Sequence, residues 1–377
     1  MRILVLNYEY PPVGGGGGQV TEDIAQGLVK QGHELTVLTT HIKGLPKEET
    51  QSGVHILRLP SWRKYKFKAD LRAMIGYIIA ASIAGMRLIR SWRPDLIHVH
   101  FAVPTGPVAW LLSKLTKTPY VLTIHLGDIP GGAPDKTSGW FRWVFPFTHP
   151  IWKDAAQVVA VSEFSRQLAL KHYSVDIAVI QNGVDTEALS PGQIRVNDPP
   201  RLIFAGRFMP QKNPVQLVRV LGQLQDLKWT CTMLGDGPLM QEVREEIASL
   251  SLQKRFSLPG WVTPEIVIDV FAQSDILFMP SRSEGLPIVG IQALSMGIAI
   301  VASDIGGFID LVEDGKNGYL IEPTNEEGFA KTLRDLLENP KKLHVFRQAS
   351  RQRAKSFDIS YIAKQYEEIF KNLKGTK

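Results

Sequence analysis

A pair of basic residues near the middle of the chain has the composition of an anion-binding loop. Arg207 and Lys212 lie in segment 206–214, directly after the apolar run Leu202–Ala205. An arginine can donate two hydrogen bonds to phosphate oxygens and a lysine adds a point charge, so together they could neutralise a diphosphate leaving group. Charge-assisted hydrogen bonds contribute about 1.5–3 kcal/mol each, enough to make the pair a leading electrostatic term. Basic residues in a loop are also often only solvated, and this alternative stays open.

A glycine-rich loop stands near the start of the chain. It follows the apolar run Ile3–Leu6 and precedes an amphipathic stretch. Glycines at a helix start let backbone N–H groups approach a ligand where the helix dipole favours phosphate, so Gly16, Gly17 and Gly18 are candidate contacts. The loop has neither a Walker ending nor Gly-x-Gly-x-x-Gly spacing, so a plain surface loop stays open as an alternative.

Histidines follow two of the apolar runs in the first half. His125 lies just past the run Tyr120–Ile124, at the strand end where open α/β sheets place their ligands. It could contact a ligand at that strand end or serve a structural role. His98 and His100 lie two apart on one predicted strand, but no third ligand stands nearby, so no metal site is predicted.

The elements that must position these residues follow a parallel α/β rhythm. Short apolar runs alternate with helix-length stretches, and the rhythm restarts after a polar stretch at 190–200, which predicts two domains, 1–190 and 191–358. The apolar stretch Leu71–Ile89 contains Arg72 and Arg87, so we interpret it as a buried crossover helix and not as a membrane span. The predicted strands are Ile3–Leu6, Leu35–Leu38, His55–Leu59, Leu96–Val99, Tyr120–Ile124, Gln157–Val161, Leu202–Ala205, Trp229–Leu234, Ile276–Met279 and Ile298–Ala302.

Composition narrows the class of protein. The single cysteine, Cys231, cannot form an internal disulfide, and the N-terminus lacks the pattern of a signal peptide, so we expect a cytoplasmic protein. The formal net charge is +6, but no recognition motif accompanies it, so nucleic acid is not an expected partner.

The motifs together resemble those of family 4 glycosyltransferases. The glycine loop, Gly-Arg-x-x-x-x-Lys, Gly-Asp-Gly-Pro, Pro-Ser-x-x-Glu-Gly, Gly-Gly and Asn-Gly occur in that family's order over nearly the whole chain. The resemblance implies an α/β chain of the GT-B fold, with two Rossmann-like domains facing across a cleft. It also implies retention of anomeric configuration, no metal or other cofactor, and a final helix, 359–377, that crosses back to the first domain.

The resemblance also assigns roles. Arg207 and Lys212 match the pair that holds the donor diphosphate, and Glu284 matches the acid that binds hydroxyls of the donor sugar. His125 matches a histidine that faces the transferred sugar. The donor implied is a UDP- or GDP-linked sugar of the hexosyltransferase type, and its phosphates are expected on the backbone amides of Gly285, Leu286, Pro287 and Ile288.

One position departs from the family pattern. The second glutamate of the paired-glutamate motif, which holds the ribose, is replaced by Gln292. An amide offers one acceptor oxygen where a carboxylate offers two, so we expect a loss on the order of 1 kcal/mol in ribose binding. Asp310 likewise stands where the family commonly has Glu.

Aromatic and basic residues gather in two segments of the first half. Segment 58–72 and the run 140–147 combine aromatic rings with cations, a composition suited to an anionic bilayer surface. We expect a peripheral membrane enzyme with a lipid or lipid-linked acceptor, with a solvated basic face or a dimer interface as alternatives. A nucleotide-sugar epimerase of the same architecture and a non-catalytic homologue with a degenerate donor site are the competing functions.

Overall fold

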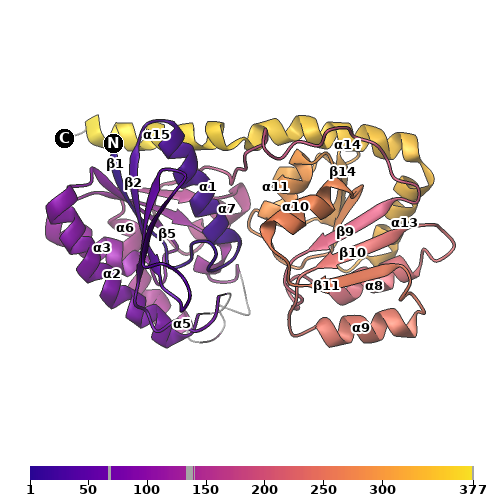
Figure 1. Cartoon of the computed structure of the whole chain (residues 1–377), viewed down its shortest axis with the longest axis horizontal. Coiled ribbons are helices and arrows are strands. Elements are labelled where there is room, and N and C mark those ends of the chain that lie inside the picture. The colour runs from indigo at the N-terminus through magenta and orange to yellow at the C-terminus, as the bar shows by residue number, and fades with distance from the viewer. Residues whose placement is uncertain (67–68, 133–138, 140, 376–377) are drawn as a thin grey trace. The chain divides into compact units, whose positions relative to one another are not determined.

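The computed structural model divides the chain into two compact units. It describes residues 1–66, 69–132, 139 and 141–375. Unit 1 combines Met1–Gly183 with Ile359–Lys377, and unit 2 is Val184–Asp358 (Figure 1). The change of unit therefore falls after Gly183, a few residues before the boundary expected at residue 190. Of the two aromatic and basic segments, residues 67, 68 and 140 lie outside the described residues.

Unit 1 is built on an eight-stranded sheet with the order β3-β4-β2-β1-β5-β6-β7-β8. All neighbouring strands are parallel except β3 and β4, which are antiparallel. The six strands predicted for this half are present, and the two edge strands β3 and β8 are additional. The strands are β1 (Arg2–Leu6), β2 (Glu34–Thr40), β3 (Glu48–Gln51), β4 (Val54–Leu59), β5 (Leu96–His100), β6 (Tyr120–Ile124), β7 (Gln157–Ala160) and β8 (Ile177–Val179).

Helices cover this sheet, and the last helix of the chain is one of them. An added Cβ at Gly27 would lie 2.9 Å from Ala363 Cβ, so α1 and α15 pack closely. His33 Nε2 also lies 3.1 Å from Glu367 Oε1. The helices are α1 (Gly16–Lys30), α2 (Leu71–Trp92), α3 (Gly106–Thr116), α5 (Phe141–Val144), α6 (His149–Lys153), α7 (Glu163–Leu170) and α15 (Ile359–Gly375).

The helix α2 differs from its sequence-based prediction. It connects β4 to β5 as a crossover helix and buries Tyr77, whose hydroxyl donates to Leu38 O at 3.0 Å. By length and composition α2 is long and apolar enough to cross a membrane. Only 33% of its most apolar 18-residue segment is buried within the protein. The expectation of a buried helix is therefore wrong for one side of α2, because small residues pack that helix on the sheet while large apolar side chains point outward.

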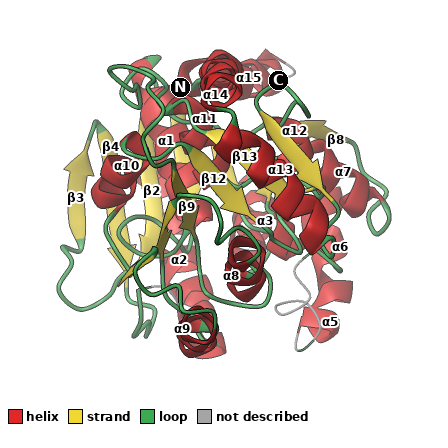
Figure 2. Cartoon of the chain, turned by 90° about the vertical axis from the view of Figure 1, so that its right-hand side faces the viewer, coloured by secondary structure: helices red, strands yellow, loops and turns green. Residues whose placement is uncertain are grey.

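Unit 2 contains a six-stranded parallel sheet with the order β11-β10-β9-β12-β13-β14. Its strands β9, β12 and β13 are labelled in Figure 2. The four strands predicted for this half are present, and β11 and β14 are additional. The strands are β9 (Arg201–Ala205), β10 (Thr230–Leu234), β11 (Phe256–Gly260), β12 (Ile276–Met279), β13 (Ala299–Ser303) and β14 (Gly318–Ile321). The helices are α8 (Pro214–Gly222), α9 (Met240–Ser249), α10 (Pro264–Ala272), α11 (Ile288–Ser295), α12 (Phe308–Leu311), α13 (Glu326–Glu338) and α14 (Pro340–Ala354).

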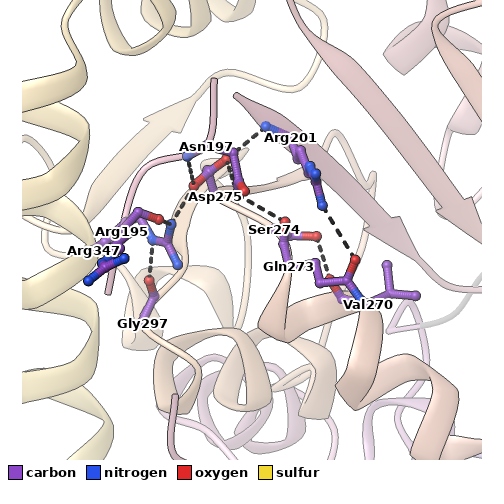
Figure 3. Close-up of polar contacts among 9 residues, drawn as sticks. All are labelled: Arg195, Asn197, Arg201, Val270, Gln273, Ser274, Asp275, Gly297 and Arg347. Carbon is purple, nitrogen blue, oxygen red and sulfur yellow. Dashed lines mark hydrogen bonds and ion pairs between the residues drawn. The ribbon is translucent and has the colours of Figure 1, made fainter. Parts of the chain in front are cut away.

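A buried ion pair and its hydrogen bonds connect the amino ends of β9 and β12. Figure 3 shows the Asp275 carboxylate accepting from the Arg347 guanidinium and from the backbone N–H of Arg201, the latter at 2.8 Å. Asn197 Nδ2 donates to the same carboxylate at 2.9 Å, and Arg347 Nε donates to Gly297 O at 2.7 Å. The side chains of Arg347 and Asp275 are 3% and 0% exposed, so each charge depends on the other. This network holds together the amino ends of two neighbouring strands in the centre of the sheet.

Candidate active site

Two loops of unit 2 meet at the carboxyl edge of its sheet. They are loop 206–213, which follows β9, and loop 280–287, which follows β12. Because β9 and β12 are parallel neighbours, both loops leave the sheet at the same edge. Gln211 Nε2 donates to Ser283 O at 2.8 Å, and the Arg282 N–H donates to Gln211 O at 2.7 Å. The two predicted motifs are therefore neighbours that are joined by hydrogen bonds.

Lys212 and Glu284 form an ion pair between these loops. Lys212 Nζ lies 2.5 Å from Glu284 Oε1, although the residues are 72 positions apart. The side chains are 18% and 6% exposed. A carboxylate this deeply buried needs a charged partner, and Lys212 provides it. An ammonium group has three donors, so Lys212 can hold Glu284 and still reach a phosphate oxygen.

Arg207 is a further cation in the loop after β9, outside the ion pair of Lys212 and Glu284. It is half-buried directly after β9. Among the described residues, no hydrogen bond or ion pair engages its guanidinium. A half-buried cation without an acceptor attracts an anion strongly, because it is partly removed from water. Arg207 is thus placed to bind a ligand, whereas Lys212 also supports Glu284.

Glycines set the position of both loops through close backbone contacts. An added Cβ at Gly235 would lie 1.9 Å from Gly206 O, and one at Gly307 would lie 2.0 Å from Gly285 O. The Gly307 N–H also donates to Glu284 O at 3.2 Å. In the sequence, Gly235 and Gly307 stand out only as members of the family pattern. In the structure, they let one segment lie directly against another that carries a charged site residue.

Backbone donors for an anion are fewer than the sequence predicted. Pro287 is the N-cap of α11 and has no N–H, so the expected set of four amides is wrong at that position. Gly285, Leu286 and Ile288 retain their N–H groups, and Ile288 opens the first turn of α11, where amides lack partners within the helix. Gln292 lies four residues later on α11, on the same side as Ile288.

In unit 1, Asp128 fixes His125 and the end of β5. Its carboxylate accepts from the His125 N–H at 2.8 Å and from the Ala102 N–H at 2.9 Å. His125 is 9% exposed, and its ring centroid lies 4.4 Å from that of Phe101. Its Nε2 lies 3.4 Å from His100 Nδ1. His125 is therefore a nearly buried side chain at the end of β6, the position that the sequence indicated.

His98 and His100 lie beneath His125 in a buried cluster. Their ring centroids are 4.4 Å apart, and His98 Nε2 lies 2.9 Å from Thr123 Oγ1. Burial lowers the pKa of His98 to about 3. Burial and the neighbouring histidines hold the pKa of His100 well below its usual range. Both rings are therefore neutral at pH 7. No group of three or more His, Cys, Asp or Glu side chains within the described residues could hold a metal ion.

The glycine loop of unit 1 serves close packing. The helix α1 begins at Gly16, so Gly16, Gly17 and Gly18 form its first turn. An added Cβ at Gly17 would lie 2.4 Å from Phe101 Cζ. Glu9 Oε2 accepts from the Gly15 N–H at 3.2 Å. A carboxylate already occupies part of this helix start, and its charge would oppose a bound phosphate.

Two family descriptions match the chain in succession. "Glycosyltransferase Family 4" matches residues 14–188, and "Glycosyl transferases group 1" matches residues 185–353. An uncharacterised glycosyltransferase of Methanocaldococcus jannaschii is 25% identical over 98% of this chain and 99% of its own length.

Solved structures resemble this chain over nearly its full length. Sucrose-phosphate synthase from Thermosynechococcus elongatus superposes with a TM-score of 0.88 at 18% identity, covering 100% of both chains. The HepE protein of Anabaena, solved with UDP and glucose, gives a TM-score of 0.79 at 21% identity, covering 99% of this chain and 100% of the other. The two α/β units and their likeness to these structures define a protein of the GT-B fold. The chain belongs to the group 1 glycosyltransferases of family 4 and is a glycosyltransferase enzyme.

Proposed function

We propose that the protein transfers a hexosyl group from a UDP- or GDP-linked sugar to an acceptor, with retention of configuration and without a metal. The observation that carries this proposal is Arg207, a half-buried guanidinium that engages no acceptor in the described chain and lies in the same loop as Lys212 of the buried pair with Glu284. The HepE structure, which shares the fold, contains UDP and glucose, and this supports a nucleotide-sugar donor.

The contacts support a distinct role for each residue. Arg207 binds the diphosphate, and Lys212 shares its ammonium between Glu284 and a phosphate oxygen. Glu284 accepts hydrogen bonds from sugar hydroxyls, and its orientation is fixed by Lys212. The first-turn amides of α11 add donors to the phosphates, and Gln292 on the same helix contacts the ribose.

The chemistry asks for positioning and charge stabilisation. As the bond between the sugar and the diphosphate breaks, negative charge grows on the leaving oxygen. Arg207 and Lys212 stabilise that charge. The leaving diphosphate accepts the proton of the acceptor hydroxyl, so no side chain needs to act as a strong base. His125, held by Asp128, binds a hydroxyl of the sugar or the acceptor.

The acceptor we propose is a lipid or a lipid-linked glycan, used at the cytoplasmic surface of a membrane. Large aromatic side chains of both aromatic and basic segments are exposed, among them Trp62, Tyr65, Trp143 and Phe147. Rings and cations together favour the headgroup region of an anionic bilayer over bulk water.

Gln292 replaces the family's ribose-binding acid, so a donor site with weakened ribose binding is the second candidate. Epimerisation is disfavoured by membership of a transferase family. The donor site can be tested by the thermal stability of the protein with UDP, GDP, ADP, CMP and their sugars, in the presence of a chelator. We expect one nucleotide to stabilise the protein. We also expect that nucleotide to be released from its sugar when a lipid extract is added as the source of acceptor. No stabilisation by any of them at millimolar concentration would contradict the proposed donor site.

A further inference from the structure

An apolar stripe runs along the outward side of α2. It consists of Leu71, Ile75, Ile79 and Ile83, which are 57%, 46%, 51% and 51% exposed. Their spacing of four residues places them along one side of the helix. Isolated exposed apolar residues are common, but four large ones in a row on one helix indicate an interaction surface.

Cations accompany the stripe and acids do not. Arg72, Arg87 and Arg90 are all exposed on α2, and no acidic residue occurs between Leu71 and Trp92. Asp70 immediately precedes the helix, but its carboxylate accepts from the Ala73 N–H at 2.8 Å as the N-cap. Arginine stems can lie along apolar surface while the guanidinium groups reach outward. The exposed side of α2 is therefore both apolar and positively charged.

A hydrogen-bonded loop extends this surface. Buried Arg63 donates to Tyr8 O and Lys66 O, both at 3.0 Å. The Gly14 N–H donates to Lys66 O at 2.8 Å, which fixes the loop from beneath. In the same loop, Trp62 and Tyr65 are 67% and 66% exposed.

The loop and the helix are in contact. An added Cβ at Gly76 of α2 would lie 2.8 Å from Trp62 Cε3, so the indole lies against the helix. Lys64 and Lys66 of the same loop are exposed beside Tyr65. We call the stripe, the three arginines and residues 62–66 the α2 face. Its helix is labelled in unit 1 in Figure 1.

We propose that the α2 face docks unit 1 on an anionic lipid bilayer, with α2 lying in the plane of the headgroups. The helix passes the length and composition test for a membrane span, but its inner side is packed on the sheet through Tyr77 and on α3 through Gly85, where an added Cβ would lie 2.6 Å from Leu112 Cδ1. A helix fixed along one side can insert only its other side. An apolar stripe flanked by arginines is the composition of interfacial helices.

Charge favours lipid over a second copy of the chain. In a symmetric dimer, this face would meet itself and bring like charges together. An anionic headgroup layer instead complements the arginines and lysines. The inference deepens the proposed function, since it gives a membrane-bound acceptor a docking surface. Its test requires neither donor nor acceptor.

The test is flotation of the full chain with vesicles. Vesicles of phosphatidylcholine alone are compared with vesicles that also contain phosphatidylglycerol, at low and high salt. We expect binding that needs phosphatidylglycerol and weakens with salt. Arg87→Ser with Arg90→Ser should lower the partition coefficient by about fivefold per charge removed. Ile75→Glu with Ile79→Glu should lower it at least about tenfold.

Ile309→Glu is the matched control, because Ile309 is 53% exposed in unit 2. It should bind vesicles like the wild type. Circular dichroism and nucleotide stabilisation of each variant report folding and the donor site separately. A protein that binds vesicles but no nucleotide would contradict the proposed function and leave this inference intact. Docking of the α2 face on a bilayer would be overturned if the wild type did not bind vesicles at low salt or if all variants bound equally. It would also be overturned if the wild type were a dimer and the Ile75 and Ile79 variant were not.

Discussion

Acidification from pH 7 to pH 5 should destabilise unit 1, because its histidine cluster is buried without charge. His98 is 1% exposed, and its pKa is lowered to about 3, chiefly by burial and secondarily by His125. In the unfolded chain, a histidine has a pKa of about 6.5. The unfolded state therefore binds more protons below pH 6.5. Stability is fully present above that pH and falls as the pH drops from about 6.5 towards 3.

The size of the effect follows from the same two values. At pH 5, the unfolded histidine has been titrated over about 1.5 pH units while the folded one remains neutral. This corresponds to a loss of about 2 kcal/mol relative to pH 7 for His98 alone. The lowered pKa of His100 acts in the same direction and adds to the loss in the wild type.

Urea unfolding at pH 7 and pH 5 measures this difference. The variant His98→Leu will be less stable at pH 7, because it loses the contact with Thr123 Oγ1. Its loss of stability between the two pH values should nevertheless be smaller than that of the wild type by about 2 kcal/mol. His149→Leu is the control, since His149 is exposed and its removal should not change the difference. Equal pH dependence in wild type and His98→Leu would refute the reasoning.

Three further predictions concern unit 2. Arg347→Met removes the cation paired with buried Asp275 and should destabilise the protein by about 3–5 kcal/mol in thermal or urea unfolding; an unchanged melting temperature would contradict the buried pair. Gly307→Ala places a Cβ 2.0 Å from Gly285 O, so it should displace the Glu284 loop and weaken nucleotide affinity more than tenfold, whereas Gly192→Ala, in open space, should not. Gln292→Glu restores an acceptor oxygen and should tighten nucleoside diphosphate binding about fivefold by calorimetry, as expected for one hydrogen bond; no change would mean that Gln292 does not contact the ribose.

The central strands were predictable from sequence because they are buried on both faces and read as continuous apolar runs. The additional strands lie towards sheet edges, where this signal fails. β3 is Glu-Glu-Thr-Gln and mostly exposed, and β8 has only three residues. The exposed side of α2 was also missed, because total hydrophobicity hides which side of a helix is packed.

The site was predictable as motifs but not as contacts. The sequence grouped Arg207, Lys212 and Glu284 through their order in a family pattern. Nothing in it indicates that Lys212 and Glu284, 72 positions apart, form an ion pair. The contact between Glu9 and the glycine loop depends likewise on a fold that brings the end of one strand to the start of a helix.

The most direct test of the donor site is calorimetric titration of UDP and GDP into wild type, Arg207→Ala and Arg282→Ala. Arg282 is the matched control, since it is an exposed cation in the loop after β12. We expect one nucleotide to bind wild type and Arg282→Ala alike, and Arg207→Ala to lose at least about tenfold in affinity, the value of one charge-assisted hydrogen bond. Equal affinity of Arg207→Ala and wild type would contradict a diphosphate site at Arg207.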